Sequence, residues 1–407
     1  MVTTPFEDTG NFTALATEQT WWADLAANNA RVTFEQVGES VQSRPIDLVC
    51  VADPTPPAGM EERQSRKPLL FITLLHGDEV AGREACMALA RDLAETTDPA
   101  LVDLLERRMV AFMPNVNPDG YAASQRNNAN NVDLNRENLR LEQPEAQVVQ
   151  TVIRDLRPYF VADMHEDTDS RVAEMAFLGP DHPQISTPLL TRTDELIDNY
   201  LFPAMDALGI TSERFWRAGT TFRTLRLVAG GRHALACLTE SHRNKSTPAV
   251  RVQAQSVFIH ETLQYIIDNE AAVDAAVENS RVDKRAEGTL ATVPFQFLGG
   301  EQTADPPPVG YRLTPAQRAT VSVNLDVLAI RDYPIVGSND RYVPMGQEAQ
   351  PLIPHLLDSR AADNSVAATA LFAAPALSLP QGIVRDGAAF PVDRWVKRDG
   401  FLRPVGT

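Results

Sequence analysis

The sequence predicts an α/β protein: a central, twisted, mixed but mostly parallel sheet with helices on both faces, plus a smaller β-rich C-terminal module. Three observations lead to this prediction. Apolar strand-like runs alternate with helical patterns over residues 1–282. The run Leu69–Leu75 (LLFITLL) is almost continuously apolar and contains β-branched residues, which is typical of a strand buried on both faces. From about residue 283 onward, short strand-like runs are separated by proline and glycine.

The first elements along the chain are a helix, two strands and a loop. Leu15–Asn29 has the apolar spacing of an amphipathic helix. Arg31–Val37 and Ile46–Ala52 alternate or run apolar, as strands do, and Pro54–Lys67 is interpreted as a loop. After the buried strand, Val80–Glu95 returns to helical spacing, so a strand and a covering helix are expected to follow one another here.

The rest of the sheet follows the same alternation. The segment Asn115–Arg136 is rich in Asn, Asp and Gly and is interpreted as loop. Pro144–Leu156 is a predicted helix because proline suits the first helical turn, and Arg251 to about Glu278 is a predicted long helix. The remaining strands are expected at Arg108–Met113, Phe160–Met164 and Ala234–Thr239.

We therefore divide the chain into a domain of residues 1–282 and a β-rich module of residues 283–407. The module contains the runs VPFQFLGG, DPPPVGYRLT and VSVNLDVLAI, which we interpret as strands between proline and glycine turns. A helix is expected near Glu348–Leu357. The sequence does not decide whether the module is a lid, a substrate filter or a dimer surface, and it leaves the oligomeric state open.

The composition excludes several classes of partner. The net charge of -17 argues against binding to nucleic acid or to an anionic membrane. We find no run of about 18 apolar residues and no basic and apolar leader, so we expect neither a membrane span nor a signal peptide. Cys50, Cys86 and Cys237 lie far apart in apolar stretches and are interpreted as buried, reduced thiols. A cytoplasmic protein is the expectation.

Candidate metal ligands follow two of the predicted strands. His76 and Glu79, in HGDE, come after the buried strand, and His165 comes after FVADM. In open α/β sheets, sites form at the carboxyl ends of strands. Two imidazoles and one carboxylate leave the fourth position of a single zinc ion free, which is the arrangement of a catalytic site. His-x-x-Glu alone is a weak signal, and a lone histidine at a strand end is more often structural.

The segment between these ligands carries a resemblance to a known family. Asn117–Glu137 reads NPDGYAASQRNNANNVDLNRE. With HGDE before it and DMH after it, the segment resembles the zinc metallocarboxypeptidase superfamily, the relatives of carboxypeptidases A, E and N. The ordered set His-x-x-Glu, Arg, Asn-Arg, His is complete, and the resemblance covers roughly residues 69–245. Two imidazoles and a glutamate are the known zinc ligands of carboxypeptidase A.

The resemblance implies a role for each matching residue. Arg126 matches the arginine that polarises the scissile carbonyl and stabilises the oxyanion. Asn135 and Arg136 match the pair that binds the terminal carboxylate of the substrate, for which a guanidinium offers two parallel hydrogen bonds. Asp133 matches the carboxylate that orients the zinc ligand His76 through its other ring nitrogen.

The catalytic base is predicted to be Glu240, which follows the strand ALACLT. The resemblance places a glutamate at the end of a late strand, where it takes a proton from the zinc-activated water and passes it to the leaving amine. The structural alternative is a glutamate that caps a helix or forms an ion pair. Glu166 and Asp167, directly after His165, are rival carboxylates, which we interpret as residues that line or support the pocket.

Two features depart from the family pattern. Many carboxypeptidases carry a tyrosine on a loop before the catalytic glutamate, but here Phe215, Trp216 and Phe222 occupy that region. What replaces the tyrosine is left open. Arg223, Arg226 and Arg232 also lie there; they either bind an acidic group or, as we favour, are solvated arginines of an acidic protein.

The sequence therefore predicts a zinc metallocarboxypeptidase that hydrolyses the C-terminal peptide or isopeptide bond of a peptide. The alternatives within the same chemistry are a murein-peptide amidase and an N-acyl amino acid deacylase of the aspartoacylase and succinylglutamate desuccinylase type, so the substrate is a peptide or an acylated amino acid. The turn NPDGY and the spacing of Arg126 and Asn128 favour the peptidase. A non-catalytic binding module is a further alternative, which the intact ligand set disfavours.

Overall fold

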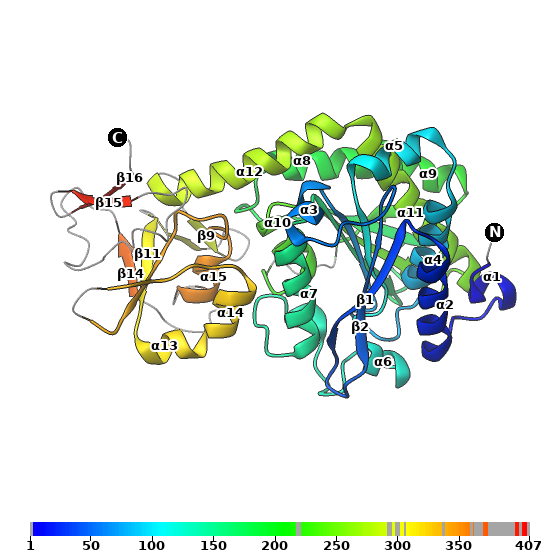
Figure 1. The fold of residues 1–407 in the computed structure, drawn as a ribbon, viewed down its shortest axis with the longest axis horizontal. Helices are drawn as coiled ribbons and strands as arrows, with labels where there is room; N and C mark the ends of the chain where they lie inside the picture. The colour runs from blue at the N-terminus through cyan, green and yellow to red at the C-terminus, as the bar shows by residue number, and fades with distance from the viewer. Residues whose placement is uncertain are drawn as a thin grey trace.

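The computed structural model describes most of the chain. The described residues are 3–216, 221–290, 295–297, 302–304, 307–335, 338–358 and 361, together with the strands 369–372, 395–398 and 401–404. Figure 1 shows a large α/β domain at the N-terminal side and a smaller module beside it, with the long helix α12 (Glu270–Leu290) running from one to the other.

A central eight-stranded sheet organises the larger domain, with the order β1-β2-β4-β3-β5-β8-β6-β7. The inner strands β4, β3, β5 and β8 are parallel, and β6 and β7 are parallel to each other. The hairpin β1-β2 and the pair β6-β8 are antiparallel, so the sheet is mixed, as predicted. Its strands are β1 (Val32–Glu39), β2 (Pro45–Val51), β3 (Leu69–Thr73), β4 (Val110–Met113), β5 (Phe160–Asp167), β6 (Met175–Leu178), β7 (Ser212–Arg214) and β8 (Leu235–His242).

Successive side chains of the central strands point to opposite faces of the sheet, and both faces are covered by helices. Leu69 and Phe71 of β3 point into one apolar core, and Leu70 and Ile72 point into another. The first core is closed by α4 (Ala81–Glu95) and α11 (Pro248–Asp268), and the second by α7 (Pro144–Leu156) and α10 (Leu225–Gly231). The near-continuous apolar run in the sequence is therefore the mark of a strand buried on both sides.

The remaining helices of this domain are α1 (Pro5–Thr9), α2 (Leu15–Asn28), α3 (Met60–Ser65), α5 (Pro99–Arg107), α6 (Pro118–Ala122), a 3-10 turn (Leu134–Arg136), α8 (Thr187–Leu196), a π-helical turn (Ile197–Leu201) and α9 (Phe202–Ala207). Several of them, among them α2, α8 and α9, also contribute apolar side chains to the first core. Two segments interpreted as loop are thus partly wrong, because 54–67 contains α3 and 115–136 contains α6 and the 3-10 turn. Pro118 at the start of α6 and the side chain of Asn117, which accepts from the backbone of Gly120, explain this short helix.

Several predicted boundaries also move. The strand β5 extends past Met164 to Asp167, and β8 extends past Thr239 to His242, since these two strands continue to pair with each other beyond the apolar runs. The helix predicted over 251–278 is two helices, α11 and α12, which meet at Asn269. Residues 99–107, for which no element was expected, form α5, which begins where Asp98 caps its first backbone N–H groups.

The smaller module contains a four-stranded antiparallel sheet with the order β12-β13-β11-β14. Its strands are β11 (Pro308–Leu313), β12 (Tyr333–Pro334), β13 (Arg341–Pro344) and β14 (Thr369–Phe372); the short pairs β9 (Phe295–Phe297) with β10 (Gln302–Ala304) and β15 (Trp395–Arg398) with β16 (Phe401–Pro404) complete the described strands. The helices are α13 (Pro315–Thr320), α14 (Ser322–Val327) and α15 (Ile353–Leu357).

One predicted strand of the module is wrong. The run VSVNLDVLAI is mostly the helix α14, in which Leu325 and Val327 are buried while the exposed residues turn to solvent at helical spacing. Asn324 on this helix donates to the backbone oxygens of Leu139 and Arg140 at 2.7 and 2.8 Å, and so ties the module to the larger domain. The division at residues 282 and 283 stays a prediction, and it falls inside α12.

The three cysteines are free and buried, as predicted, and burial raises the pKa of Cys50 to about 12. No helix among the described residues combines the length and apolar character that crossing a membrane requires.

His233 is a buried histidine whose two ring nitrogens both have partners. Nδ1 lies 2.9 Å from Oγ of Ser280 and Nε2 lies 2.7 Å from the backbone oxygen of Glu348. Burial, with smaller contributions from Arg281 and Arg157, lowers the pKa of His233 to about 4. Both polar atoms of this ring are therefore satisfied within the protein core.

Acid is expected to destabilise the protein through His233. The unfolded chain takes up the proton below about pH 6.5, whereas the folded chain does so only near pH 4, so stability is full above pH 6.5 and falls as the pH drops. The loss amounts to about 3 kcal/mol at pH 4, from about 1.4 kcal/mol per pH unit. Urea unfolding of wild type and His233→Asn at neutral and mildly acidic pH measures it; Asn tolerates the positive φ of 69° at this position.

The variant should show a flatter pH dependence than wild type. His260→Gln, on the exposed side of α11, is the matched control and should keep the wild-type slope. Equal slopes in His233→Asn and wild type would show that other groups cause the acid sensitivity.

Candidate active site

Three neighbouring parallel strands bring the predicted metal ligands and the predicted base together. His76 follows the end of β3, His165 lies in β5, and Glu240 lies in β8. The register pairs Thr73 with Met164 and His165 with Glu240, so all three side chains reach the same edge of the sheet. His165 and Glu240 are within their strands and not after them, because β5 and β8 are longer than the sequence indicated.

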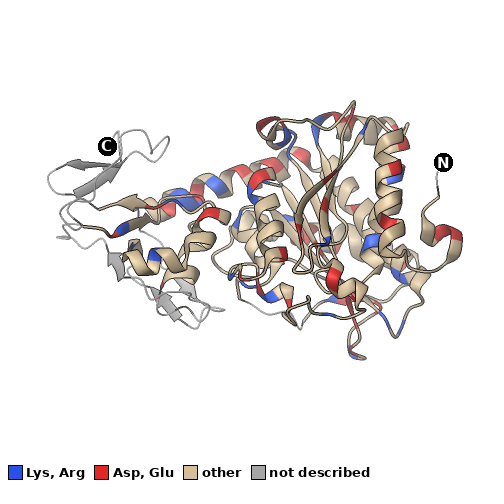
Figure 2. Ribbon diagram, turned by 60° about the horizontal axis from the view of Figure 1, so that its bottom comes forward, with Lys and Arg blue, Asp and Glu red and all other residues tan. Residues whose placement is uncertain are grey.

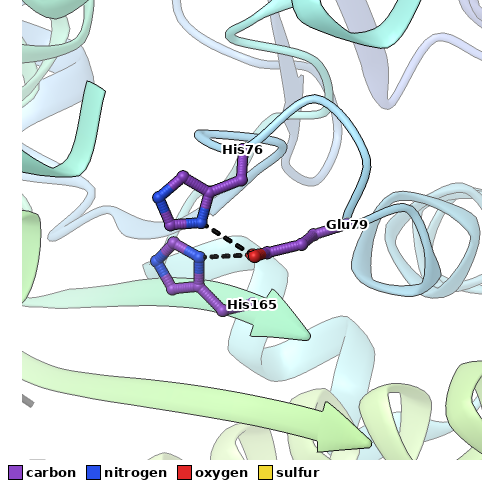
Figure 3. Close-up of side chains that lie close together, drawn as sticks. All are labelled: His76, Glu79 and His165. Atoms are coloured by element: carbon purple, nitrogen blue, oxygen red, sulfur yellow. Dashed lines mark hydrogen bonds and ion pairs between the residues drawn. The ribbon is translucent and has the colours of Figure 1, made fainter. Parts of the chain in front are cut away.

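His76, Glu79 and His165 form a compact buried group, in which both rings turn toward the carboxylate (Figure 3). Nδ1 of His165 lies 2.7 Å from Oε2 of Glu79, and Nδ1 of His76 lies 2.9 Å from Oε1. One ligand atom from each residue lies within 4.8 Å of the other two. Burial alone would raise the pKa of Glu79, but the two imidazoles outweigh it and hold the pKa of this carboxyl below its usual range.

An aspartate lies behind each imidazole. Nε2 of His76 is 3.1 Å from Oδ1 of Asp133, and Nε2 of His165 is 2.6 Å from Oδ1 of Asp163. A carboxylate on Nε2 fixes the tautomer in which Nε2 carries the proton and Nδ1 offers its lone pair. Asp163 was not among the predicted site residues; the signal that pointed to it is its place two residues before His165, on the same face of β5.

The two Nδ1 atoms and the Glu79 carboxylate fit a zinc ion. Nδ1 of His76 is buried and, despite its short distance to Glu79, lacks the alignment of a hydrogen bond, so it has no hydrogen-bond partner. Nitrogen and carboxylate oxygen are the donors that zinc takes in catalytic sites. The geometry therefore leaves a buried nitrogen whose lone pair a metal ion would satisfy.

The segment NPDG is packed tightly against HGDE. A Cβ atom on Gly77 would lie 2.2 Å from the backbone carbon of Gly120, so close approach of two backbones requires glycine here. The amide of Asn117 donates to the backbone oxygens of Leu75 and Arg126, each at 3.2 Å. The backbone N–H of Gly77 also donates to Arg126 O, at 3.1 Å. These contacts fix the Arg126 loop beside the ligands.

Arg126 reaches over the three candidate metal ligands. Its guanidinium donates to Oε1 of Glu79 at 3.2 Å and to Oδ2 of Asp133 at 3.1 Å, and about half of its side chain is exposed to the cavity. Burial would raise the pKa of Asp133, but the hydrogen bond from His76 and the nearby arginine lower it. Asp133 therefore connects His76 to Arg126.

Asn135 and Arg136 follow Asp133 in the 3-10 turn and line the same cavity. The Asn135 amide is already bonded, because it donates to Asp163 at 3.2 Å and lies 2.8 Å from Nε2 of His165. Its oxygen accepts from the backbone N–H of Leu225 at 2.8 Å. The Arg136 side chain is exposed to the cavity, so of the predicted pair Arg136 is the one that a substrate reaches freely.

Glu240 lies in the wall of this cavity, and its Oε2 is buried without a hydrogen-bond partner. Burial raises the pKa of Glu240 well above its usual range, with the Glu79 carboxylate adding to the rise and His165 opposing it. Glu166 is engaged elsewhere, since it accepts from the backbone N–H groups of Val80 and Ala81 at 2.6 and 3.2 Å and pairs with Arg251. Glu166 therefore supports the start of α4.

The cavity has a volume of about 460 Å³. Phe215 lines it in the region where a loop tyrosine was missing, and Arg226 and Arg243 line it as well. The interpretation of Arg226 as a solvated arginine is wrong: it is fully buried and donates to Gly179 O at 2.6 Å and to Asp181 at 2.7 Å. Arg243, which was not predicted, pairs with Asp78 at 2.8 Å.

Comparison with known proteins finds that part of the chain is similar to zinc carboxypeptidases. Residues 18–151 match a family model described as zinc carboxypeptidase. Carboxypeptidase SOL1 of Arabidopsis thaliana is 35% identical over 141 residues, which are 32% of this chain and 28% of that protein. Human carboxypeptidase D is 37% identical over 111 residues, 25% of this chain and 8% of that protein. The chain thus spans less than a third of these relatives.

Solved structures share the fold. A metallo-carboxypeptidase from Burkholderia cenocepacia superposes with a TM-score of 0.53 at 18% identity, covering 62% of this chain and 69% of that one. Carboxypeptidase A from Helicoverpa armigera gives 0.52 at 19%, covering 65% and 75%. The resemblance to zinc metallocarboxypeptidases and the carboxypeptidase-like fold are confirmed, while the family match ends before His165 and Glu240.

Gly77→Ala should destabilise the protein, because its Cβ would press on the backbone of Gly120 and Tyr121, which cannot move aside as a side chain does. Overpacking of this kind costs about 1–3 kcal/mol in the free energy of unfolding. Gly59→Ala is the control, since nothing lies within 4 Å of its Cβ position; it replaces only the N-cap glycine of α3 and should lower stability less than Gly77→Ala does. Denaturant unfolding compares the two; equal effects would contradict the close contact.

Asp133→Asn should weaken zinc binding roughly 10- to 100-fold, because the amide no longer supplies the negative charge that makes His76 a good ligand. Competition with a fluorescent zinc chelator measures the affinity. Asp98→Asn is the matched control, since Asp98 is exposed and caps α5, where asparagine caps equally well. Unchanged affinity in Asp133→Asn would rule out this role.

Proposed function

We propose that this protein is a zinc-dependent metallocarboxypeptidase that hydrolyses the C-terminal peptide or isopeptide bond of a peptide. One observation carries the proposal: the cavity that contains His76, Glu79 and His165 is also lined by an unpartnered buried carboxylate, Glu240, and by an accessible guanidinium, Arg136. Metal ligands, proton acceptor and anion holder thus face one space, as hydrolysis beside a free carboxylate requires.

His76, Glu79 and His165 would hold one zinc ion, with Asp133 and Asp163 orienting the two imidazoles. When bound, zinc activates water as a nucleophile and polarises a carbonyl. The trio supplies three protein ligands, and the remaining side of the group faces the cavity.

Glu240 is the proposed general base and acid. Its free Oε2 can accept a proton from water in the cavity, and no protein donor competes for that oxygen among the described residues. A carboxyl whose environment favours the protonated form can then deliver the same proton to the leaving amine nitrogen. Glu166 is not suited to this step, because its carboxylate is held by α4 and Arg251.

Arg126 is the proposed oxyanion stabiliser and Arg136 the proposed carboxylate holder. The Arg126 guanidinium lies beside Glu79 and is partly exposed, so it can turn toward charge that develops on the scissile carbonyl oxygen. Arg136 can bind the terminal carboxylate through two parallel hydrogen bonds. Asn135 keeps its proposed place at this carboxylate, and its bond to Asp163, which orients His165, would link substrate binding to a metal ligand.

A deacylase of N-acyl amino acids and a murein-peptide amidase use the same kinds of group and stay as alternatives. The relatives named carboxypeptidase favour a peptide substrate. Activity on blocked dipeptides compared with N-acyl amino acids separates the carboxypeptidase from the deacylase. A cytoplasmic location stays a prediction.

Glu240→Gln should lower kcat by roughly 10²- to 10⁴-fold on peptides with a free C-terminus, because the amide cannot take the proton. Mass spectrometry of a peptide library digested by zinc-loaded protein gives the rates, and peptides with an amidated C-terminus should resist cleavage. Glu61→Gln, on the surface of α3, is the control and should cleave as wild type does. A fully active Glu240→Gln would move the base to another carboxylate.

A further inference from the structure

A second cavity lies at the opposite edge of the central sheet, between the larger domain and the C-terminal module. It has a volume of about 340 Å³, enough for a small metabolite. Arg157 and Arg232, in its wall, lie three residues before the starts of β5 and β8, whereas His165 and Glu240 lie near the ends of these strands. The length of such strands places the two cavities about 20 Å apart. The second cavity is therefore separate from the proposed active site.

Arginine dominates the lining of this cavity. Six arginines line it, against a single carboxylate, that of Glu348; the arginines are Arg154, Arg157, Arg232, Arg281, Arg285 and Arg331. Figure 2 shows the basic positions on α12 where this helix reaches the module. In a chain with a net charge of -17, a random distribution of charged residues would not place six arginines and only one carboxylate around one cavity.

The protein neutralises only part of this charge. Glu348 pairs with Arg157 at 2.8 Å and with Arg285 at 2.7 Å, and so shows that the cluster binds an oxyanion. Arg154 pairs with Asp155 at 2.7 Å. Among the described residues, no carboxylate forms an ion pair with the other three, which are Arg232, Arg281 and Arg331.

Helix ends account for some of these arginines but not for all. Arg157 and Arg232 directly follow the last residues of α7 and α10, where the helix dipole favours a cation. Arg281 and Arg331 have no such position. Burial, together with the neighbouring Arg154 and Arg157, lowers the pKa of Arg232 to about 10.

The module contributes Arg331, whose backbone is held in place by a side chain of the same module. The backbone N–H of Arg331 donates to the Gln347 side chain at 2.8 Å, and the Gln347 amide donates back to Arg331 O at 3.1 Å. Arg331 belongs to the module and is exposed, whereas Arg232 and Arg281 belong to the larger domain. A ligand in the cavity would therefore contact both parts of the protein.

We propose that this cavity binds a small anion with one or more phosphate groups, and that the anion acts as an effector that stabilises the packing of the C-terminal module on the larger domain. Guanidinium groups match phosphate oxygens through paired hydrogen bonds, and several converging arginines favour a ligand with more than one negative charge. The site does not depend on the proposed hydrolysis, because none of its residues lines the active-site cavity.

Isothermal titration calorimetry of the full, zinc-loaded chain at low ionic strength tests the site. The probes are inorganic phosphate, pyrophosphate and glucose 6-phosphate, which distinguish free phosphate, a diphosphate and a phosphate ester. At least one probe should bind with one site per chain, and Arg331→Gln and Arg232→Gln should each weaken it about tenfold or more. The bound probe should also raise the Tm of wild type and not that of Arg331→Gln.

Arg312→Gln is the matched control, since Arg312 is an exposed arginine of the module that pairs with Asp340 and does not line the cavity. It should bind as wild type does, and so should Glu240→Gln. No binding of any probe to wild type would overturn the proposal. Equal affinities of the probe for wild type and Arg331→Gln would also overturn the proposal. They would indicate that the anion binds elsewhere, for example at the zinc-loaded active site, where Arg331 has no effect.

Discussion

The proposed active site depends on a row of alternating carboxylates and imidazoles, which runs Asp133, His76, Glu79, His165, Asp163. Each imidazole lies between two acids, one at Nε2 and one at Nδ1. Asp133 and Asp163 favour the tautomer in which Nε2 carries the proton. The lone pairs of both Nδ1 atoms are then on the side of Glu79. Burial makes each of these interactions stronger than it would be in water, and it also makes the row intolerant of a missing member.

Two parts of the fold hold this row together. The parallel register of β3, β5 and β8 brings His76 and His165 to one edge of the sheet and puts Glu240 beside them. The segment from Asn117 to Arg136 then closes over that edge, fixed by the contact of Gly77 with Gly120 and by the Asn117 amide. The sheet therefore supplies the ligands, while the polar segment supplies the arginines and Asp133 that work around them.

Charge is distributed very unevenly in this acidic protein. At one edge of the sheet, the arginines of the proposed active site are mostly paired with nearby carboxylates, as Arg126 is with Glu79 and Asp133. At the other edge, arginines outnumber carboxylates around the cavity beside the C-terminal module. The two edges are joined by β5 and β8, so the same strands carry a proposed chemical site at one end and a proposed anion site at the other.

By itself, the sequence determined the fold class and named the groups that the structure gathers at the candidate metal site. Apolar runs indicate which strands are buried on both faces. The motifs HGDE, NPDG and NVDLNRE combine residue types and spacings that are typical of few classes of enzyme. Short helices capped by Asp98 and Asn117 escaped prediction, because a cap is a local bond that overrides a loop-like composition.

Only the tertiary structure decided which groups meet. Asp163, the engaged amide of Asn135, the burial of Arg226 and the arginine cluster around Arg232 all depend on contacts between segments distant in the chain. A side chain in a sequence has a type and a spacing but no neighbours. Distances, burial and pairing arise only when strands come into register and segments close over them, and those quantities decide whether a charged residue is solvated, structural or able to bind a ligand.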